Sequence, residues 1–154
     1  MKGIKMITVG KIKEDYFRDG IAYFQKEIRK RYPVSVLECP DEPTPDKASP
    51  AEEDKIRKTE GKRIMQKITG DDYVIALCID GIHYDTVRWQ RHLDKLVPRI
   101  SGSMTFVIGG SLGLSPEVIK RADERLSFSA MTFPHQMMRL ILFEQIARWT
   151  AGQQ

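Results

Sequence analysis

A glycine loop is the stretch whose residue types and spacing are best suited to bind a ligand. The apolar run Thr105–Ile108 has the length of a buried strand, and the pattern Gly-Gly-x-x-Gly follows it from Gly109 to Gly113. A helix restarts at Ser115, with proline in its first turn. Glycines at the end of a buried strand let backbone N–H and C=O groups approach a ligand closely, because no Cβ stands in the way. The loop is therefore either a backbone cradle for a ligand or a tight turn that binds nothing.

The spacing excludes the two common phosphate-binding motifs. Gly-Gly-x-x-Gly is not the dinucleotide pattern Gly-x-Gly-x-x-Gly, and no Gly-x-x-x-x-Gly-Lys-Ser/Thr occurs in the chain. The two cysteines, Cys39 and Cys78, lie far apart and form no Cys-x-x-Cys pair. Each lies in an apolar run, where a buried reduced thiol is ordinary. We therefore expect no metal and no disulfide.

Strands and helices alternate along the chain and predict an open α/β fold that positions this loop. The run Val74–Ile79 is almost wholly apolar and ends at Asp80-Gly81, which is typical of a parallel strand in a sheet covered by helices on both faces. The other expected strands are residues 4–9, 34–37, 105–108 and 126–129. The expected helices are residues 14–32, 50–68, 85–96, 116–125 and 136–150. We expect residues 1–154 to form a single domain.

One proline-rich segment interrupts this alternation. Residues 39–50 contain four prolines and almost nothing apolar, which predicts a mobile surface loop. Ser49 and Glu52 form a capping box around Pro50, so the next helix begins there.

Composition sets limits on location and partners. The 25 basic and 21 acidic side chains leave a net charge of +4 and a pI near 9.1, which permits a polyanionic partner without requiring one. The basic run Lys26–Arg31 is either a solvated helix end or a nucleic-acid contact. The first apolar stretch is too short for a signal peptide, and nowhere do about 18 apolar residues follow one another. We therefore expect a cytoplasmic protein without a membrane span.

The last helix is apolar around most of its circumference. Its few polar side chains, among them Glu144, Gln145 and Arg148, cannot shield it as they would shield a surface helix. Such a helix is either a wholly internal element or a subunit interface, and we favour a homodimer. On that hypothesis Leu142 is an interface residue.

Three segments resemble a known family. They are Val107-Ile-Gly-Gly-Ser-Leu-Gly-Leu, Leu126-Ser-Phe-Ser-Ala-Met-Thr-Phe-Pro-His-Gln-Met-Met-Arg139 and Leu142-x-Glu-Gln-Ile146, with Leu77-x-Ile-x-Gly81 upstream. They look like the SPOUT-class RNA methyltransferases and, more closely, the ribosomal RNA large subunit methyltransferase H family. The resemblance covers essentially the whole chain, including the opening strand that ends in Val9-Gly10-Lys11. It implies a C-terminal trefoil knot within the α/β fold, a rare exception to the rule against threading.

The resemblance also implies a methyl donor and a substrate. S-adenosylmethionine would sit bent in the knot, held mainly by backbone groups of three loops. The matching positions are Leu77, Gly109, Phe128, Ser129, Ala130, Met131, Thr132 and Phe133. Members of the family act as homodimers on assembled ribosomes, where they methylate N3 of a pseudouridine in the helix 69 loop of 23S ribosomal RNA. They usually end in a tail with a Tyr-His pair, whereas this sequence ends at Gly152-Gln-Gln154, so either the sequence is shortened or this member has lost the tail. A true loss would affect substrate docking and the catalytic assignments but not the cofactor site.

Two residues next to the presumed cofactor loop are candidates for catalysis. We hypothesise that His135 orients or deprotonates the base, and that Arg139 binds phosphate or the negative charge that develops on the uracil ring. Alternatively, His135 caps the last helix and shapes the loop, because a pKa of about 6.5 makes it a mediocre base for so weak an acid. His92, within a helix, is most simply a surface residue. The competing function is a non-catalytic ribosome- or RNA-binding module that uses the glycine loop as a ligand cradle.

Overall fold

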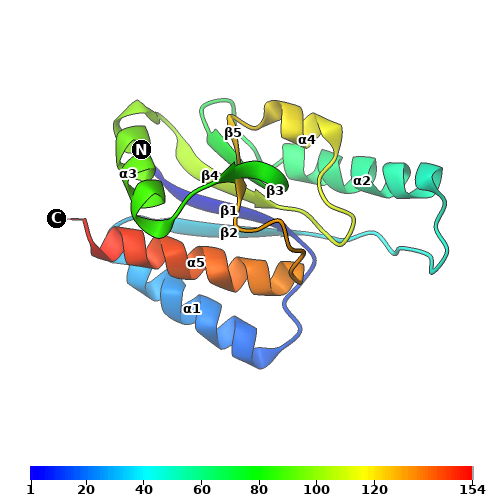
Figure 1. The fold of residues 1–154 in the computed structure, drawn as a ribbon, viewed down its shortest axis with the longest axis horizontal. Coiled ribbons are helices and arrows are strands. Elements are labelled where there is room, and N and C mark those ends of the chain that lie inside the picture. Colours follow the sequence, from blue (N-terminus) through cyan, green and yellow to red (C-terminus); the bar gives the residue numbers. More distant parts are fainter. Residues whose placement is uncertain (154) are drawn as a thin grey trace.

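Five parallel strands form one sheet at the centre of the molecule (Figure 1). The computed structural model describes residues 1–153, so Gln154, the last residue of the predicted domain, lies outside the described residues. The strands are β1 (Gly3–Val9), β2 (Val34–Cys39), β3 (Tyr73–His83), β4 (Ser103–Ile108) and β5 (Glu124–Ser127). Their order is β2-β1-β4-β3-β5, and each neighbouring pair is parallel. The predicted open α/β fold is confirmed.

Helices cover both faces of this sheet. They are α1 (Asp15–Arg29), α2 (Pro50–Met65), α3 (Thr86–Leu96), α4 (Pro116–Arg121) and α5 (His135–Ala151), with a short 3-10 turn at Val97–Arg99. Successive residues of β1 point to opposite faces, so Met6 belongs to one hydrophobic cluster and Ile7 to the other. The first cluster includes side chains of α1, α3 and α5, and the second includes side chains of α2 and α4. Figure 1 shows α1 and α5 side by side, away from α2 and α4. The trefoil knot stays a prediction.

Polar side chains fix where three of these helices begin. The capping box at α2 is confirmed, since Ser49 accepts the Glu52 N–H at 3.1 Å and the Glu52 carboxylate accepts the Ser49 N–H at 3.2 Å. Asp85 accepts the Arg88 N–H at 2.8 Å at the start of α3. Ser115 caps α4, where its hydroxyl accepts the Val118 N–H at 3.4 Å.

Three predicted boundaries after the glycine loop are wrong. Helix α4 ends at Arg121 instead of Arg125, and β5 begins at Glu124 instead of Leu126 and ends at Ser127. The reason is Asp123, whose carboxylate accepts the Val74 N–H at 2.8 Å and whose own N–H donates to the Val74 carbonyl at 2.8 Å. These bonds tie the chain to β3, so it leaves the helix early and enters the sheet. Apart from β3, four other elements differ at one end by two residues or more. Helix α1 stops at Arg29, α2 stops at Met65, β2 continues to Cys39 and β4 begins at Ser103.

Strand β3 continues past its predicted end at Asp80-Gly81. It pairs with β5 at Leu77, loses register over the next residues, and pairs again at Ile82 and His83. Gly81 lies so close to β5 that a Cβ there would stand 2.7 Å from the Leu126 carbonyl carbon. The missing side chain therefore allows the strand to bulge and return to the same partner.

Replacing Gly81 with alanine is expected to lower the free energy of unfolding by about 1–3 kcal/mol. The added methyl meets backbone atoms of β5, which cannot swing aside as the end of a side chain could. Urea denaturation measures the change. Gly70→Ala is the matched control, because a Cβ at Gly70 has no atom within 4 Å. Equal stability of the two variants would contradict the tight contact.

His92 is not the surface residue that its helix position suggested. Its Nε2 lies 2.7 Å from the Glu124 carboxylate, which also accepts the Tyr73 hydroxyl at 2.9 Å, and its ring stacks on Tyr84. His92 therefore joins α3 to β5, and the helical periodicity carried no sign of this partner.

Candidate functional site

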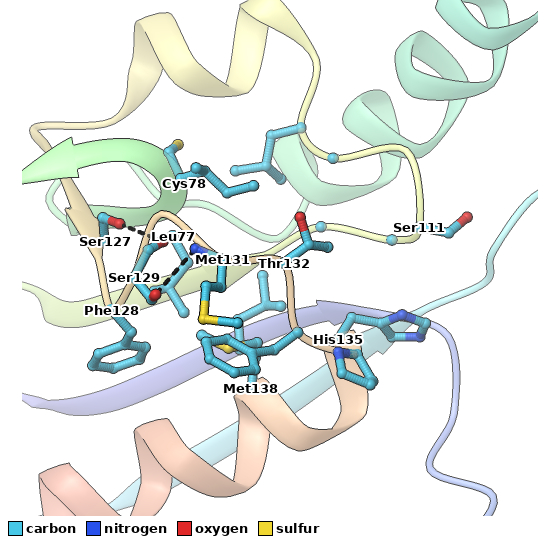
Figure 2. A pocket seen from close by; sticks show the side chains of 18 of the residues that line it. Leu77, Cys78, Ser111, Ser127, Phe128, Ser129, Met131, Thr132, His135 and Met138 are labelled. Atoms are coloured by element: carbon cyan, nitrogen blue, oxygen red, sulfur yellow. Dashed lines mark hydrogen bonds between the residues drawn. The ribbon is translucent and has the colours of Figure 1, made fainter.

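Three turns meet at the carboxyl edge of the sheet and enclose one pocket of about 700 Å³ (Figure 2). They are the bulged part of β3 at Leu77–Ile79, the loop after β4 at Gly109–Leu114 and the turn after β5 at Phe128–Pro134. Carboxyl ends of parallel strands share one edge, which is where open α/β sheets bind ligands. The volume lies within the range of small-molecule sites, roughly 300–1,000 Å³. The convergence of these turns gives the chain a ligand-sized cavity.

The glycine loop is both a tight turn and a wall of the pocket. Gly113 has a φ of +83°, and its N–H donates to the Gly110 carbonyl at 3.1 Å. A Cβ on Gly109 would stand 2.9 Å from the carbonyl carbon of Gly113. From α2, Arg57 donates to the Leu112 carbonyl at 3.3 Å. Glycine is therefore required for the chain to close on itself while its backbone faces the cavity.

Two serines hold the turn after β5 in shape. The Ser127 hydroxyl donates to the Ser129 carbonyl at 3.1 Å, and the Ser129 hydroxyl accepts the Met131 N–H at 3.0 Å, as the dashed lines in Figure 2 show. Phe128 packs edge-on against Trp89 of α3, with ring centroids 6.5 Å apart. The turn after β5 is thus held in one conformation by side-chain hydrogen bonds and by the packing of Phe128.

The walls of the pocket are mostly apolar. Of the described residues that line it, none is Asp, Glu, Lys or Arg. Cys78 lines it as well, and burial raises the pKa of this thiol above its ordinary value, so the sulfur stays protonated near neutral pH. Specific binding would therefore depend on backbone N–H and C=O groups and on the shape of the apolar surface.

Most of the predicted cofactor-binding residues lie around this pocket. Those that line it are Leu77, Gly109, Phe128, Ser129, Met131, Thr132 and Phe133. Ala130 does not line it, because it is exposed at the apex of the turn that Ser129 and Met131 close. Sequence reasoning missed Cys78, Leu114 and Met138, which also line the cavity. Helical spacing could have indicated Met138, which lies three residues after His135 on the same face of α5.

His135 lies at the mouth of the pocket as the first residue of α5. Burial lowers its pKa below the ordinary value, and Arg139 and Lys13 lower it further, while Asp41 opposes them. The imidazole is therefore neutral at pH 7, with a ring nitrogen free to accept a proton. Pro134 occupies the N-cap position and makes no side-chain capping bond. The capping part of the alternative is therefore wrong, while a role of His135 in shaping the loop stays a prediction.

Arg139 does not line the pocket. Its side chain is only 2% exposed and donates to Glu38 at 2.8 Å, to the Val9 carbonyl at 2.9 Å and to the Gly10 carbonyl at 2.7 Å. These bonds fasten the second turn of α5 to the ends of β1 and β2. A guanidinium held in this way has no free face for a phosphate or a uracil ring, so the structure contradicts direct contact and supports a positioning role.

Replacing Arg139 with alanine is expected to lower the free energy of unfolding by about 2–3 kcal/mol, near the lower end for broken buried ion pairs because Glu38 stays partly solvated. Two buried strand-end carbonyls would also lose their donor. Urea denaturation reports the loss. Arg148→Ala on the same helix is the control, since that exposed pair with Glu144 contributes about 0–1 kcal/mol. An equal loss of unfolding free energy in both variants would show that the buried bonds of Arg139 do not stabilise the fold.

The apolar circumference of α5 is covered by the chain itself. Leu142, Phe143 and Ile146 are 0% exposed and belong to the cluster that includes α1 and the sheet. Leu142 is therefore a core residue and not an interface residue, and a charge there would unfold the protomer. The pattern of α5 reflects an internal helix, so it does not support a homodimer.

Two kinds of feature are absent from the part of the chain that the structure describes. No group of three or more His, Cys, Asp or Glu side chains within residues 1–153 is arranged to hold a metal ion. No helix over the same residues is long and apolar enough to cross a membrane.

Comparison with known families identifies the fold and its chemistry. A family model described as "Predicted SPOUT methyltransferase" matches residues 1–151. The chain belongs to this family. It is a SPOUT methyltransferase in which the glycine loop, the part of β3 around Leu77 and the Phe128–Phe133 turn line one pocket. The resemblance seen in the sequence is therefore confirmed.

Its relatives among known SPOUT methyltransferases are close. Over 145 residues the chain is 49% identical to ribosomal RNA large subunit methyltransferase H of Streptococcus thermophilus strain CNRZ 1066, covering 94% of this chain and 91% of that protein. Identity is 48% to proteins of the same name from Lactiplantibacillus plantarum and Listeria monocytogenes, with the same coverage. These matches place the chain in the methyltransferase H group of the family.

A solved structure supports the architecture independently of sequence. A probable methylase family protein from Haemophilus influenzae Rd KW20 superposes with a TM-score of 0.52 at 11% identity, covering 96% of this chain and 66% of that one. At this identity the match supports the fold alone.

Proposed function

We propose that this SPOUT methyltransferase transfers a methyl group from S-adenosylmethionine to N3 of a pseudouridine in the helix 69 loop of 23S ribosomal RNA, acting on assembled ribosomes in the cytoplasm. One observation carries the proposal: three turns far apart in sequence converge on a single pocket in a chain of this family. Relatives nearly half identical over most of their length bear the name of a ribosomal RNA large subunit methyltransferase. The target nucleotide rests on the family resemblance.

The pocket fits the methyl donor. Leu77, Met131 and Phe133 supply apolar surface for an adenine ring. The backbone of Gly109 and of Phe128 to Thr132 supplies hydrogen-bond donors and acceptors, and at Gly109 no Cβ blocks the approach of the ligand. When bound, S-adenosylmethionine supplies a methyl carbon activated by a positive sulfur. No side chain of this chain then needs to act as a nucleophile, so its work is to position the base and remove a proton.

His135 is the proposed proton acceptor. With the donor bound, the neutral imidazole of His135 would accept the N3 proton while the methyl group moves from the donor sulfur to N3. Arg139 contributes indirectly, since its bonds to Val9, Gly10 and Glu38 fix the helix turn that presents His135. Met138, one turn along α5, closes the wall beside it.

A homodimer is part of the proposal. It follows from the family resemblance, and exposed apolar side chains near the pocket support it, since Ile79, Ile82 and Met131 are 54%, 53% and 69% exposed. A second copy would cover such a patch. Two chains of net charge +4 would also give the assembly about +8 for holding RNA.

The proposed function is tested with unmethylated bacterial ribosomes, isotope-labelled S-adenosylmethionine and mass-spectrometric mapping of the labelled nucleotide. We expect one methyl group per ribosome, at N3 of a helix 69 pseudouridine, and little transfer to protein-free 23S RNA. Label at another nucleotide would overturn the assigned target. Binding of ribosomes without donor binding or transfer would instead indicate a non-catalytic module.

A further inference from the structure

The loop after β1 is a rigid feature that the proposed chemistry leaves unused. We call residues 10–14 the rim loop. Gly10 turns the chain with a φ of +85°, and its N–H donates to the Cys39 carbonyl at 2.8 Å. Ile12 is 9% exposed and anchors the loop in the core. The Lys13 N–H donates to Gln136 of α5 at 3.1 Å. The rim loop is therefore fixed to the helix turn that carries His135.

This loop lies directly beside His135. A Cβ on Gly10 would stand 3.9 Å from the His135 Nε2 and 3.9 Å from the Asp41 carboxyl carbon. The Arg139 guanidinium donates a hydrogen bond to the Gly10 carbonyl at 2.7 Å. The rim loop therefore borders the part of the pocket that contains His135, where a target base would meet the imidazole.

The rim loop presents two lysines outward. Lys11 and Lys13 are exposed on either side of buried Ile12, and neither has a carboxylate partner within 4 Å among residues 1–153. The nearby acid Asp15 pairs instead with Arg18 at 2.7 Å. Two free ammonium groups on a fixed loop make a binding site for an anion without the entropic cost of ordering the backbone.

We infer that Lys11 and Lys13 bind backbone phosphate of the RNA next to the target base. The pocket itself has no Lys or Arg among its lining residues, so an RNA strand entering it must find positive charge at the rim. Neither lysine lines the pocket, so neither is placed to bind the carboxylate of a methyl donor within it. The inference rests on the proposed function and adds the residues that hold the substrate.

The test compares Lys11→Ala/Lys13→Ala with the wild-type chain for binding to unmethylated bacterial ribosomes over a series of salt concentrations. Each single-strand phosphate contact contributes about 0.7 to the slope of log affinity against log salt, so losing two lowers it by about 1.4. Binding then weakens about 25-fold at roughly 0.1 M salt. Lys58→Ala/Lys95→Ala removes the same charge from exposed positions on α2 and α3 and is the matched control. Lys11→Arg/Lys13→Arg keeps the charge and should restore affinity.

Four results have distinct meanings. An affinity and salt slope that fall only in the rim-loop alanine variant support the inference. An equal fall of affinity and salt slope in the control variant overturns the inference, because the effect would then come from net charge alone. Loss of S-adenosylmethionine binding in calorimetry would assign the lysines to the donor and also overturn it. If the wild-type chain binds ribosomes and methylates nothing, the proposed function fails while the rim-loop comparison still stands.

Discussion

Replacing His135 with alanine is expected to slow methyl transfer by about 100- to 1,000-fold, the range of a lost general base. The imidazole lies on a helix turn fixed by Arg139, so its removal takes away the proton acceptor and leaves the rest of the pocket lining in place. Donor affinity should stay within about twofold, because backbone and apolar groups form most of the pocket. Single-turnover methylation of ribosomes and calorimetry with S-adenosylmethionine measure the two quantities separately.

A histidine outside the pocket is the control. His83 is exposed at the end of β3 and does not line the cavity, so His83→Ala should turn over normally. Near-normal turnover of His135→Ala would remove His135 from the mechanism.

The pH profile gives an independent reading of the same residue. Because burial lowers the pKa of His135, the base form persists below pH 6.5, and the rate should decline only as the pH falls through this lowered value. The residual rate of His135→Ala should lack that decline. A wild-type rate that already falls between pH 8 and 7 would indicate a different group.

Replacing Gly109 with alanine is expected to weaken S-adenosylmethionine binding by about 100-fold. The new Cβ would stand 2.9 Å and 3.0 Å from the carbonyl carbon and oxygen of Gly113, so the loop must open and shift the backbone that faces the donor. Calorimetry measures the affinity, and circular dichroism confirms that the sheet persists. Gly70→Ala, which meets no atom within 4 Å, should bind as the wild type does. Unchanged affinity in Gly109→Ala would show that the glycine loop does not hold the donor.

The sequence predicted the sheet and the pocket well because both depend on local patterns. Unbroken apolar runs mark buried parallel strands, and Gly109 to Gly113 mark a loop where they end. The ends of β3 and β5 were missed because they depend on Gly81 packing against β5 and on Asp123 bonding to Val74, contacts between residues distant in sequence.

Burial of polar residues was the harder part of the site to predict. Arg139 is separated from Val9 and Gly10 by about 130 residues of chain, and nothing in its neighbourhood in sequence indicates that it is 2% exposed. The apolar pattern of α5 was compatible with an internal helix or an interface, and only the packing of Leu142 against the protomer's own core separates the two. Periodicity reports how much of a helix is covered, but it does not report by which chain.

The most direct measurement is a crystal structure of the full chain grown with S-adenosylhomocysteine, the demethylated product of the donor. The ligand is expected between Leu77, Gly109 and the Phe128–Phe133 turn, with the sulfur directed toward His135. An empty pocket at saturating ligand, or density for the ligand at another surface, would contradict the central claim that these three turns form the methyl-donor site.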